Sequence, residues 1–158
     1  MTVAGQHALP AVGQEAPGFS LPSTGGGEVS LGDFRGKQNV LLAFFPLAFT
    51  STCTAEMCEF SEEYARYEST DTAVLPISVD SVPTLRAFKA HEGLRLEMLS
   101  DFHREVARAY GVLKQPQFFA ERAYILIDRR GVVRWAHVES ELGTKRETAD
   151  LMRAIAAA

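Results

Sequence analysis

The feature that most constrains the fold is the apolar run Asn39 to Phe45, which leads through a proline to Cys53 and Cys58, five residues apart. An apolar run without alternation is typical of a strand buried on both faces of a sheet. Pro46 ends this strand, and the segment beyond it predicts a helix from about Cys53 to Tyr67. A cysteine therefore lies where a buried strand passes through a loop into a helix.

The remaining patterns predict a mixed sheet covered by helices. Pro76 lies inside an apolar segment, where proline removes a hydrogen-bond donor and prefers sheet edges or bulges. The segment 23–27 predicts a hairpin with a flexible tip, Asp128 to Gly131 predicts a tight turn, and residues 1–15 are expected to fray. Alternating strands and helices predict a parallel crossover, and the late hairpin adds antiparallel strands, which gives a single α/β domain over residues 1–158. Further strands are predicted at 19–21, 29–31, 73–79, 96–99, 123–127 and 132–138, and helices at 83–91, 104–110 and 145–158.

Charge and composition exclude several function classes. The net charge is −4 and no cluster of Lys and Arg stands out, so we expect no nucleic-acid partner and no anionic membrane partner. No segment approaches the ~18 apolar residues of a membrane span. The first seven residues have neither the basic start nor the apolar core of a secretory signal. Two cysteines do not make a disulfide scaffold, and we expect a cytoplasmic protein in which they carry redox or metal chemistry.

The position of Cys53 favours a reactive thiolate. A helix N-terminus offers unpaired N–H groups and partial positive charge, which stabilise the nucleophilic, ionised form of a thiol. At roughly 100° per residue, four residues fall on the same side as Cys53 and predict a stripe that faces the core, so its sulfur should be only narrowly accessible. Cys58 points about 140° away, towards a more polar side of the helix. The stripe consists of Met57, Phe60, Tyr64 and Tyr67.

Two other roles for the cysteines stay open at this point. Free cysteines are often buried and only pack, which is a serious alternative for Cys58 and a weak one for Cys53, because Pro46 and Thr50 precede Cys53 at a specific spacing. A metal site is the second alternative, but two cysteines fall short of the four ligands that zinc usually takes. The histidines are scattered, without ligand spacing, at His7, His91, His103 and His137.

The spacing Pro46-x-x-x-Thr50-x-x-Cys53 resembles the peroxiredoxin active-site motif, P-x-x-x-T-x-x-C. Arg122 occupies the place of the second active-site arginine of that family. Residues 45–50 resemble the alkyl hydroperoxide reductase E branch, whereas a cysteine at position 58 resembles the peroxiredoxin Q, or bacterioferritin comigratory protein, branch. Further family signals cover nearly the whole chain, namely GQEAPGFSL at 13–21, LGDFRG at 31–36, LSD at 99–101 and AYGV at 109–112.

The resemblance implies a thioredoxin-like fold with a mixed central sheet, flanking helices and an N-terminal β-hairpin. It also implies a thiol-dependent peroxidase that reduces hydrogen peroxide and small organic hydroperoxides. Cys53 would be the peroxidatic thiolate and would become a sulfenic acid. Arg122 would hold this thiolate and the charge on the departing oxygen, Thr50 would accept and relay a hydrogen bond from the peroxide, and Pro46 would exclude water.

The resemblance also implies the rest of the catalytic cycle. Cys58 would resolve the sulfenic acid as an intramolecular disulfide, which thioredoxin or a similar dithiol would reduce. Glu56 would pair with Arg122 or bind backbone N–H groups, although simple placement near a helix N-terminus is an equal alternative. No metal and no organic cofactor is required, because sulfur performs the electron chemistry. The protein would act as a monomer or a homodimer.

Four other functions remain alternatives. A one-cysteine peroxidase recycled by an external thiol would leave Cys58 as a packed residue. A thioredoxin-like disulfide exchanger would carry C-x-x-C rather than the C-x-x-x-x-C found between Cys53 and Cys58. A glutathione-peroxidase-like enzyme shares the architecture but lacks the motif. A binding module without catalysis would not react with peroxide at all.

Overall fold

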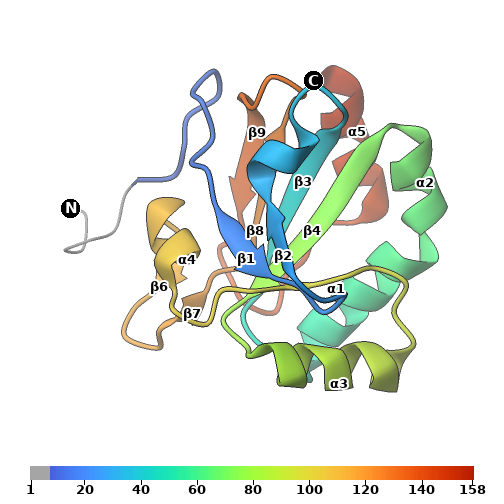
Figure 1. Ribbon diagram of the computed structural model, residues 1–158, viewed down its shortest axis with the longest axis vertical. Helices are drawn as coiled ribbons and strands as arrows, with labels where there is room; N and C mark the ends of the chain where they lie inside the picture. Colours follow the sequence, from blue (N-terminus) through green and yellow to red (C-terminus); the bar gives the residue numbers. More distant parts are fainter. Residues whose placement is uncertain (1–7) are drawn as a thin grey trace.

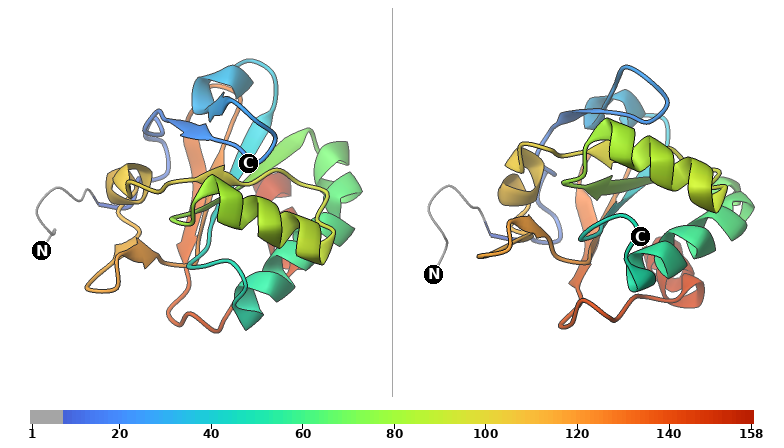
Figure 2. Two further views of the ribbon diagram at one scale, coloured as in Figure 1. Left: turned by 60° about the horizontal axis from the view of Figure 1, so that its bottom comes forward. Right: turned by 90° about the horizontal axis from the view of Figure 1, so that it is seen from below.

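A five-stranded sheet covered on both faces organises the computed structural model, which describes residues 8–158 (Figure 1, Figure 2). In chain order the elements are β1 (Ser20–Pro22), β2 (Glu28–Ser30), η1 (Leu31–Phe34), β3 (Asn39–Phe44), α1 (Ser51–Glu62), α2 (Tyr64–Ser69), β4 (Thr72–Ser78), α3 (Val82–Glu92), β5 (Leu99–Ser100), α4 (Glu105–Ala109), β6 (Leu113–Lys114), β7 (Phe119–Ala120), β8 (Ala123–Ile127), β9 (Val133–Val138) and α5 (Thr148–Ala157).

The sheet is mixed, as the sequence predicts. Its strand order is β5-β4-β3-β8-β9, with β3 parallel to β4 and β4 parallel to β5. The two remaining pairs, β3 with β8 and β8 with β9, are antiparallel. A separate hairpin of β1 and β2 precedes the sheet, so the predicted thioredoxin-like fold with an N-terminal hairpin is confirmed.

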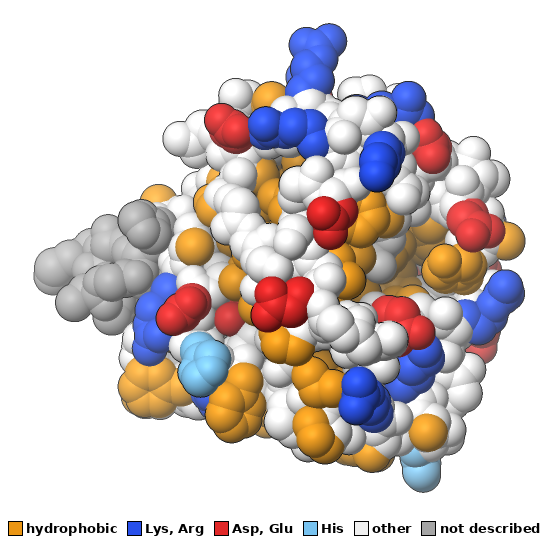
Figure 3. All heavy atoms as spheres, in the orientation of Figure 1, with side chains coloured by type: hydrophobic (Ala, Val, Ile, Leu, Met, Phe, Trp, Pro, Cys, Tyr) orange, Lys and Arg blue, Asp and Glu red, His pale blue; other side chains and the backbone are white. Residues whose placement is uncertain are grey.

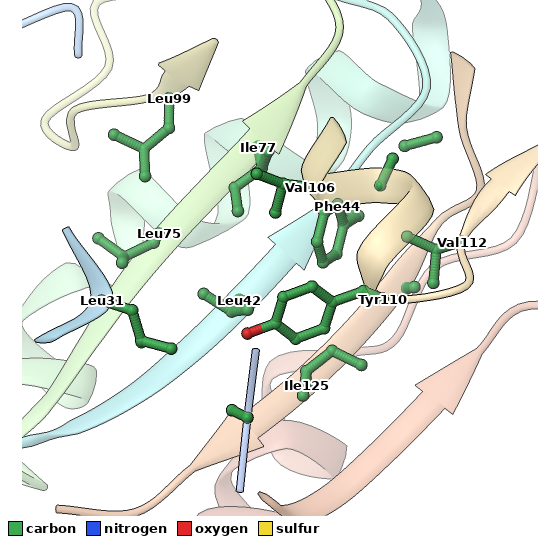
Figure 4. Packing of buried hydrophobic residues seen from close by; sticks show 14 of the residues in the cluster. Leu31, Leu42, Phe44, Leu75, Ile77, Leu99, Val106, Tyr110, Val112 and Ile125 are labelled. Carbon is green, nitrogen blue, oxygen red and sulfur yellow. The ribbon is translucent and has the colours of Figure 1, made fainter. Parts of the chain in front are cut away.

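Strand β3 is buried on both faces, which explains its apolar run without alternation. Its alternate residues belong to two different clusters, since successive side chains of a strand point to opposite faces. Leu41 and Phe45 pack in the cluster that includes α1, α3 and α5. Leu42 and Phe44 pack in the other cluster, beside Tyr110 at the end of α4 (Figure 4). The sheet therefore separates two cores, and the cysteines lie on the side of α1.

Pro76 lies in β4, which is flanked by two strands and is not an edge. The carbonyl of Ile77 accepts a hydrogen bond from the N–H of Phe45, so Ile77 faces β3. Pro76 and Ser78 face the other neighbour by alternation, and β5 pairs with β4 only at Ile77 and Ser78. At Pro76 the side that lacks an N–H donor therefore has no strand paired with it, and no hydrogen bond of the sheet is lost.

The helix predicted from Cys53 to Tyr67 is in fact two helices, α1 and α2, separated at Glu63. Glu59 precedes Glu62 and Glu63 at this break by three and four residues. Like charges at these spacings disfavour a continuous helix. The break places the Tyr67 ring against that of Phe60, with centroids 5.5 Å apart. The predicted stripe is confirmed at Cys53, Met57 and Phe60, and also at Tyr67 beyond the break, since all four are buried. Tyr64 is the exception, because it is only half-buried.

The N-terminal segment is more ordered than predicted. Residues 1–7 lie outside the described residues, but the N–H of Gly13 donates to the carbonyl of Val133, and residues 15 and 132 form a bridge. The first hairpin is also tied to a distant segment beside its tip. Ser23 and Thr24 are buried, and the Thr24 N–H donates to the carbonyl of Met98. In both places backbone pairing with a distant segment overrides the small, polar composition.

The C-terminal helix begins three residues later than predicted. Glu147 caps it, since a capping box links its side chain and that of Asp150 to the backbone of the first turn. Lys145 lies outside the helix and its amine donates to Glu59 of α1. The short elements η1, β6 and β7 are not predicted by the sequence, because two to four residues carry too little periodicity.

The face of the molecule drawn in Figure 3 carries no strong electrostatic bias. Acidic and basic side chains are interspersed over the face drawn in Figure 3, without a basic patch. Among residues 8–158 no helix is long and apolar enough to cross a membrane.

Candidate active site

The loop between β3 and α1 presents Cys53 in the first turn of a helix. Helix α1 begins at Ser51, with Thr50 as its N-cap, so it starts two residues earlier than predicted. The segment after β4 fixes the loop, because the N–H of Ala48 donates to a carboxylate oxygen of Asp80 at 2.8 Å. Cys53 therefore lies close to the helix N-terminus, and only 1% of it is exposed.

A cavity of about 280 Å³ lies beside the Cys53 sulfur. Four of the six predicted site residues line it, namely Pro46, Thr50, Cys53 and Arg122, and they come from three segments of the chain. Its volume suits a small substrate, in agreement with the narrow access expected from the helix geometry. The remaining lining residues are Leu47, Ser51, Thr52, Phe119, Leu142 and Gly143.

Arg122 contacts the sulfur directly. It immediately precedes β8, and its Nη2 lies 3.2 Å from Sγ of Cys53. The same nitrogen donates to the carbonyl of Leu142 at 3.0 Å, which fixes the plane of the guanidinium. Burial alone would lower the pKa of Arg122, but the adjacent Glu56 and Cys53 together raise it above its usual value. A fixed cation is therefore held against the candidate nucleophile.

Glu56 is a buried partner of this arginine and not a residue that merely complements a helix dipole. Because α1 begins at Ser51, Glu56 lies in the second turn, and only 2% of it is exposed. Its Oε1 accepts a hydrogen bond from Nη1 of Arg122 at 2.7 Å, and its Oε2 accepts one from the hydroxyl of Tyr124. Burial raises the pKa of Glu56, although Arg122 and Tyr124 both oppose that effect.

Thr50 presents a hydroxyl oxygen to the cavity. Its O–H donates to the carbonyl of Leu47 at 2.7 Å, and it does not cap the helix with its side chain. A hydroxyl that donates in this way keeps its lone pairs free to accept. A peroxide O–H in the cavity could therefore donate to Thr50 while Arg122 donates to the peroxide from the opposite side.

Cys58 lies away from the cavity, as the helix geometry predicts. It is half-buried, and its Sγ is 3.7 Å from Oε1 of Glu92 in α3. Burial raises the pKa of the Cys58 thiol, and the Glu92 carboxylate raises it further. Both cysteines are free thiols in this structure. The described residues also contain no group of three or more His, Cys, Asp and Glu side chains that could hold a metal ion.

The sequence interpretation missed three parts of the site. Tyr124 could have been found, because residues 122 and 124 share one face of a strand and both reach Glu56. The carbonyl of Leu142 and the ring of Phe119 carry no such signal. Leu142 lies in an irregular loop and Phe119 in the two-residue strand β7, and the path of both segments depends on the tertiary structure.

The chain is similar to known proteins over most of its length. Residues 12–136 match the model of the AhpC/TSA family. Alkyl hydroperoxide reductase E of Mycobacterium tuberculosis is 37% identical over 150 residues, which cover 92% of this chain and 98% of that protein. The chloroplastic 2-Cys peroxiredoxin of Hordeum vulgare is 32% identical over 164 residues, covering 98% of this chain and 78% of that protein.

The fold has close structural relatives as well. The reduced 2-Cys peroxiredoxin of Plasmodium vivax superposes with a TM-score of 0.86 at 32% identity, covering 92% of this chain and 80% of that chain. Fold and site together define a thiol-based peroxidase with a thioredoxin-like architecture. The chain belongs to the AhpC/TSA family and is a peroxiredoxin.

Proposed function

We propose that Cys53 is the peroxidatic residue of this enzyme and that it reduces hydrogen peroxide and small organic hydroperoxides. The thiolate attacks one oxygen of the peroxide, the O–O bond breaks, and the sulfur becomes a sulfenic acid. The other oxygen leaves as an alkoxide or hydroxide and takes up a proton. The observation that carries this proposal is the contact of Arg122 with the Cys53 sulfur beside a cavity of substrate size.

The surrounding residues stabilise charge that develops during this displacement. Negative charge moves from sulfur to the departing oxygen, and Arg122 is placed to hold both ends of it. Thr50 accepts a hydrogen bond from the peroxide and orients it for attack. Pro46 lines the cavity at the end of β3 and keeps water from the sulfur. The reaction needs no metal and no organic cofactor, because the sulfur itself is oxidised.

We propose further that Cys58 resolves the sulfenic acid and that thioredoxin or a similar dithiol reduces the resulting disulfide. The enzyme would work in the cytoplasm as a monomer or a homodimer. If Cys58 is only a packed thiol, an external thiol must take its place. The raised pKa of Cys58 favours that second possibility for as long as α1 stays folded.

Mixing the reduced protein with one equivalent of hydrogen peroxide tests the proposed function directly. Intact mass should show a gain of one oxygen, or a loss of two hydrogens once a disulfide has formed. Peptide mapping should locate either change at Cys53. A protein whose mass stays unchanged while the peroxide remains in solution would refute the peroxidase function and favour a binding module.

Arg122→Lys should slow the first oxidation step by about tenfold or more. The guanidinium contacts Glu56, Leu142 and Cys53 at once with a planar set of donors, whereas lysine offers one flexible charge. Stopped-flow oxidation of the reduced protein by peroxide measures this effect. Arg129→Lys is the control, because within residues 8–158 the ion-pair partner of the Arg129 side chain is the exposed Asp71, away from the cavity. An unchanged oxidation rate for Arg122→Lys would remove its role.

A further inference from the structure

Tyr124 lies beneath the active site without touching the cavity. It is the second residue of β8, it is fully buried, and its hydroxyl has partners on two different elements. The O–H donates to Oε2 of Glu56 in α1, and its oxygen accepts a hydrogen bond from the N–H of Arg146 at 3.0 Å. The hydroxyl therefore donates one hydrogen bond and accepts one. The roles proposed for Pro46, Thr50 and Arg122 in the oxidation of Cys53 do not explain either of them.

The two oxygens of Glu56 are held by two donors from one strand face. Arg122 and Tyr124 are two residues apart at the start of β8, so their side chains point to the same face of the sheet. One donates to Oε1 and the other to Oε2. Within the described residues Oε2 has no other partner, so without the tyrosine hydroxyl a buried carboxylate oxygen would be unpaired. A buried carboxylate in that state moves or takes up a proton.

We propose that Tyr124 is a positioning residue for the oxidation of Cys53, which acts by holding Glu56 so that Glu56 holds Arg122 against the sulfur. This inference rests on the proposed function of Cys53. The chain of contacts runs from the Tyr124 hydroxyl through the Glu56 carboxylate and the Arg122 guanidinium to Sγ of Cys53. Every member of it is at least 98% buried, and Glu56 and Tyr124 do not line the cavity, so bulk water does not solvate their hydrogen bond.

The proposal has a specific consequence for the dependence of the reaction on pH. Three groups face Glu56, namely Arg122 just before β8, Tyr124 in β8, and Lys145 in the segment before α5. All three favour the ionised form of Glu56. Removing the hydrogen bond from Tyr124 therefore raises the pKa of Glu56 further. Protonated Glu56 can no longer anchor Arg122 as a carboxylate does. The loss of rate on the acid side should then begin at a higher pH in a Tyr124→Phe variant.

The test compares Tyr124→Phe with Tyr110→Phe in the full-length protein. Tyr110 is also buried, but its hydroxyl donates to the carbonyl of Pro17 in the other core (Figure 4). Both variants should lose some thermal stability, because each leaves a buried group without its partner. Only Tyr124→Phe should slow the oxidation of Cys53 by peroxide, by about threefold to tenfold. Only its pH–rate profile should shift to higher pH on the acid side.

A double-mutant cycle shows whether the effect passes through Glu56. In a Glu56→Gln background, Tyr124→Phe should change the oxidation rate by less than about twofold, because the carboxylate charge through which Tyr124 acts on Arg122 is already gone. Suppose instead that Tyr124→Phe lowers stability while its oxidation rate and pH–rate profile equal those of the wild type. The tyrosine then only packs, and the proposal is overturned. A full effect in the Glu56→Gln background would also overturn it. A wild-type protein that does not react with peroxide would instead refute the proposed function itself.

Discussion

Cys53→Ser should abolish the consumption of peroxide, with a fall in rate of at least roughly 1,000-fold, because a serine hydroxyl stays protonated at neutral pH and is a poor nucleophile. The fold should survive. Serine is slightly smaller than cysteine, and Arg122 can donate to its oxygen as it does to the sulfur. The cost in stability should stay near 1 kcal/mol, the typical value for a single substitution.

The measurement is the rate of peroxide loss, together with thermal unfolding of the same sample. Cys58→Ser is the matched control, since it also removes one thiol from α1 but should retain the first oxidation at nearly the wild-type rate. A Cys53→Ser variant that still consumes hydroperoxide at a comparable rate would show that another group carries the reaction. If both variants lost the first oxidation, the two cysteines could not be assigned separate roles.

Much of the fold follows from a few segments whose patterns are determined locally. The run Val40 to Phe45 contains no polar residue, and the structure buries it on both faces. The turn Asp128 to Gly131 also forms as predicted, with Asp128 accepting from the N–H groups of Arg130 and Val132. In such segments local preference and tertiary packing agree.

The failures occur where long-range contacts decide the outcome. The start of α5 is set by a capping box and by Lys145 turning to Glu59, and no helical periodicity marks that boundary. The contact that holds Thr24 of the first hairpin depends on Met98, far away in sequence. At the candidate site, too, locally patterned residues could be predicted and residues placed by long-range contacts could not. Its motif residues were recognisable, whereas the carbonyl of Leu142 that orients Arg122 belongs to a loop with no pattern of its own.

The step after oxidation requires α1 to open. Cα atoms five residues apart in a helix are separated by roughly 8–9 Å, whereas a disulfide needs about 7 Å or less. Cys53 and Cys58 also lie on different faces of α1, one in the core and one beside Glu92. We therefore predict that residues 50–61 lose their helical structure when the disulfide forms, and that this local opening limits turnover.

The structure suggests how far the opening extends. Glu59 accepts hydrogen bonds from the backbone and side chain of Thr148 at 3.0 and 2.8 Å, and Lys145 contacts it as well. These contacts tie the second half of α1 to α5, so the loss of structure should be greatest before Glu59. Removing fully buried Met57 from the core costs about 2 kcal/mol. That cost is a lower bound, because the same opening also separates the buried Glu56–Arg122 pair.

Opening should also activate Cys58. In the closed helix burial and Glu92 raise the pKa of its thiol, so Cys58 is held in the less reactive form. Unwinding removes both effects in the same motion that brings the two sulfurs together. Hydrogen exchange of the oxidised protein should show lost protection in residues 50–61, and Cys53→Ser treated with peroxide should show none. Loss of protection spread over the whole chain would indicate general destabilisation.

Cys58→Ser should separate the two halves of the cycle. Its first oxidation should stay within about twofold of the wild type, whereas steady-state turnover with thioredoxin should fall by at least about tenfold, because the sulfenic acid at Cys53 has no internal partner. The stalled sulfenic acid should also over-oxidise more readily, which intact mass detects as a second and third added oxygen. If Cys58→Ser cycles normally with thioredoxin, the half-buried thiol beside Glu92 only packs, and an external thiol resolves Cys53.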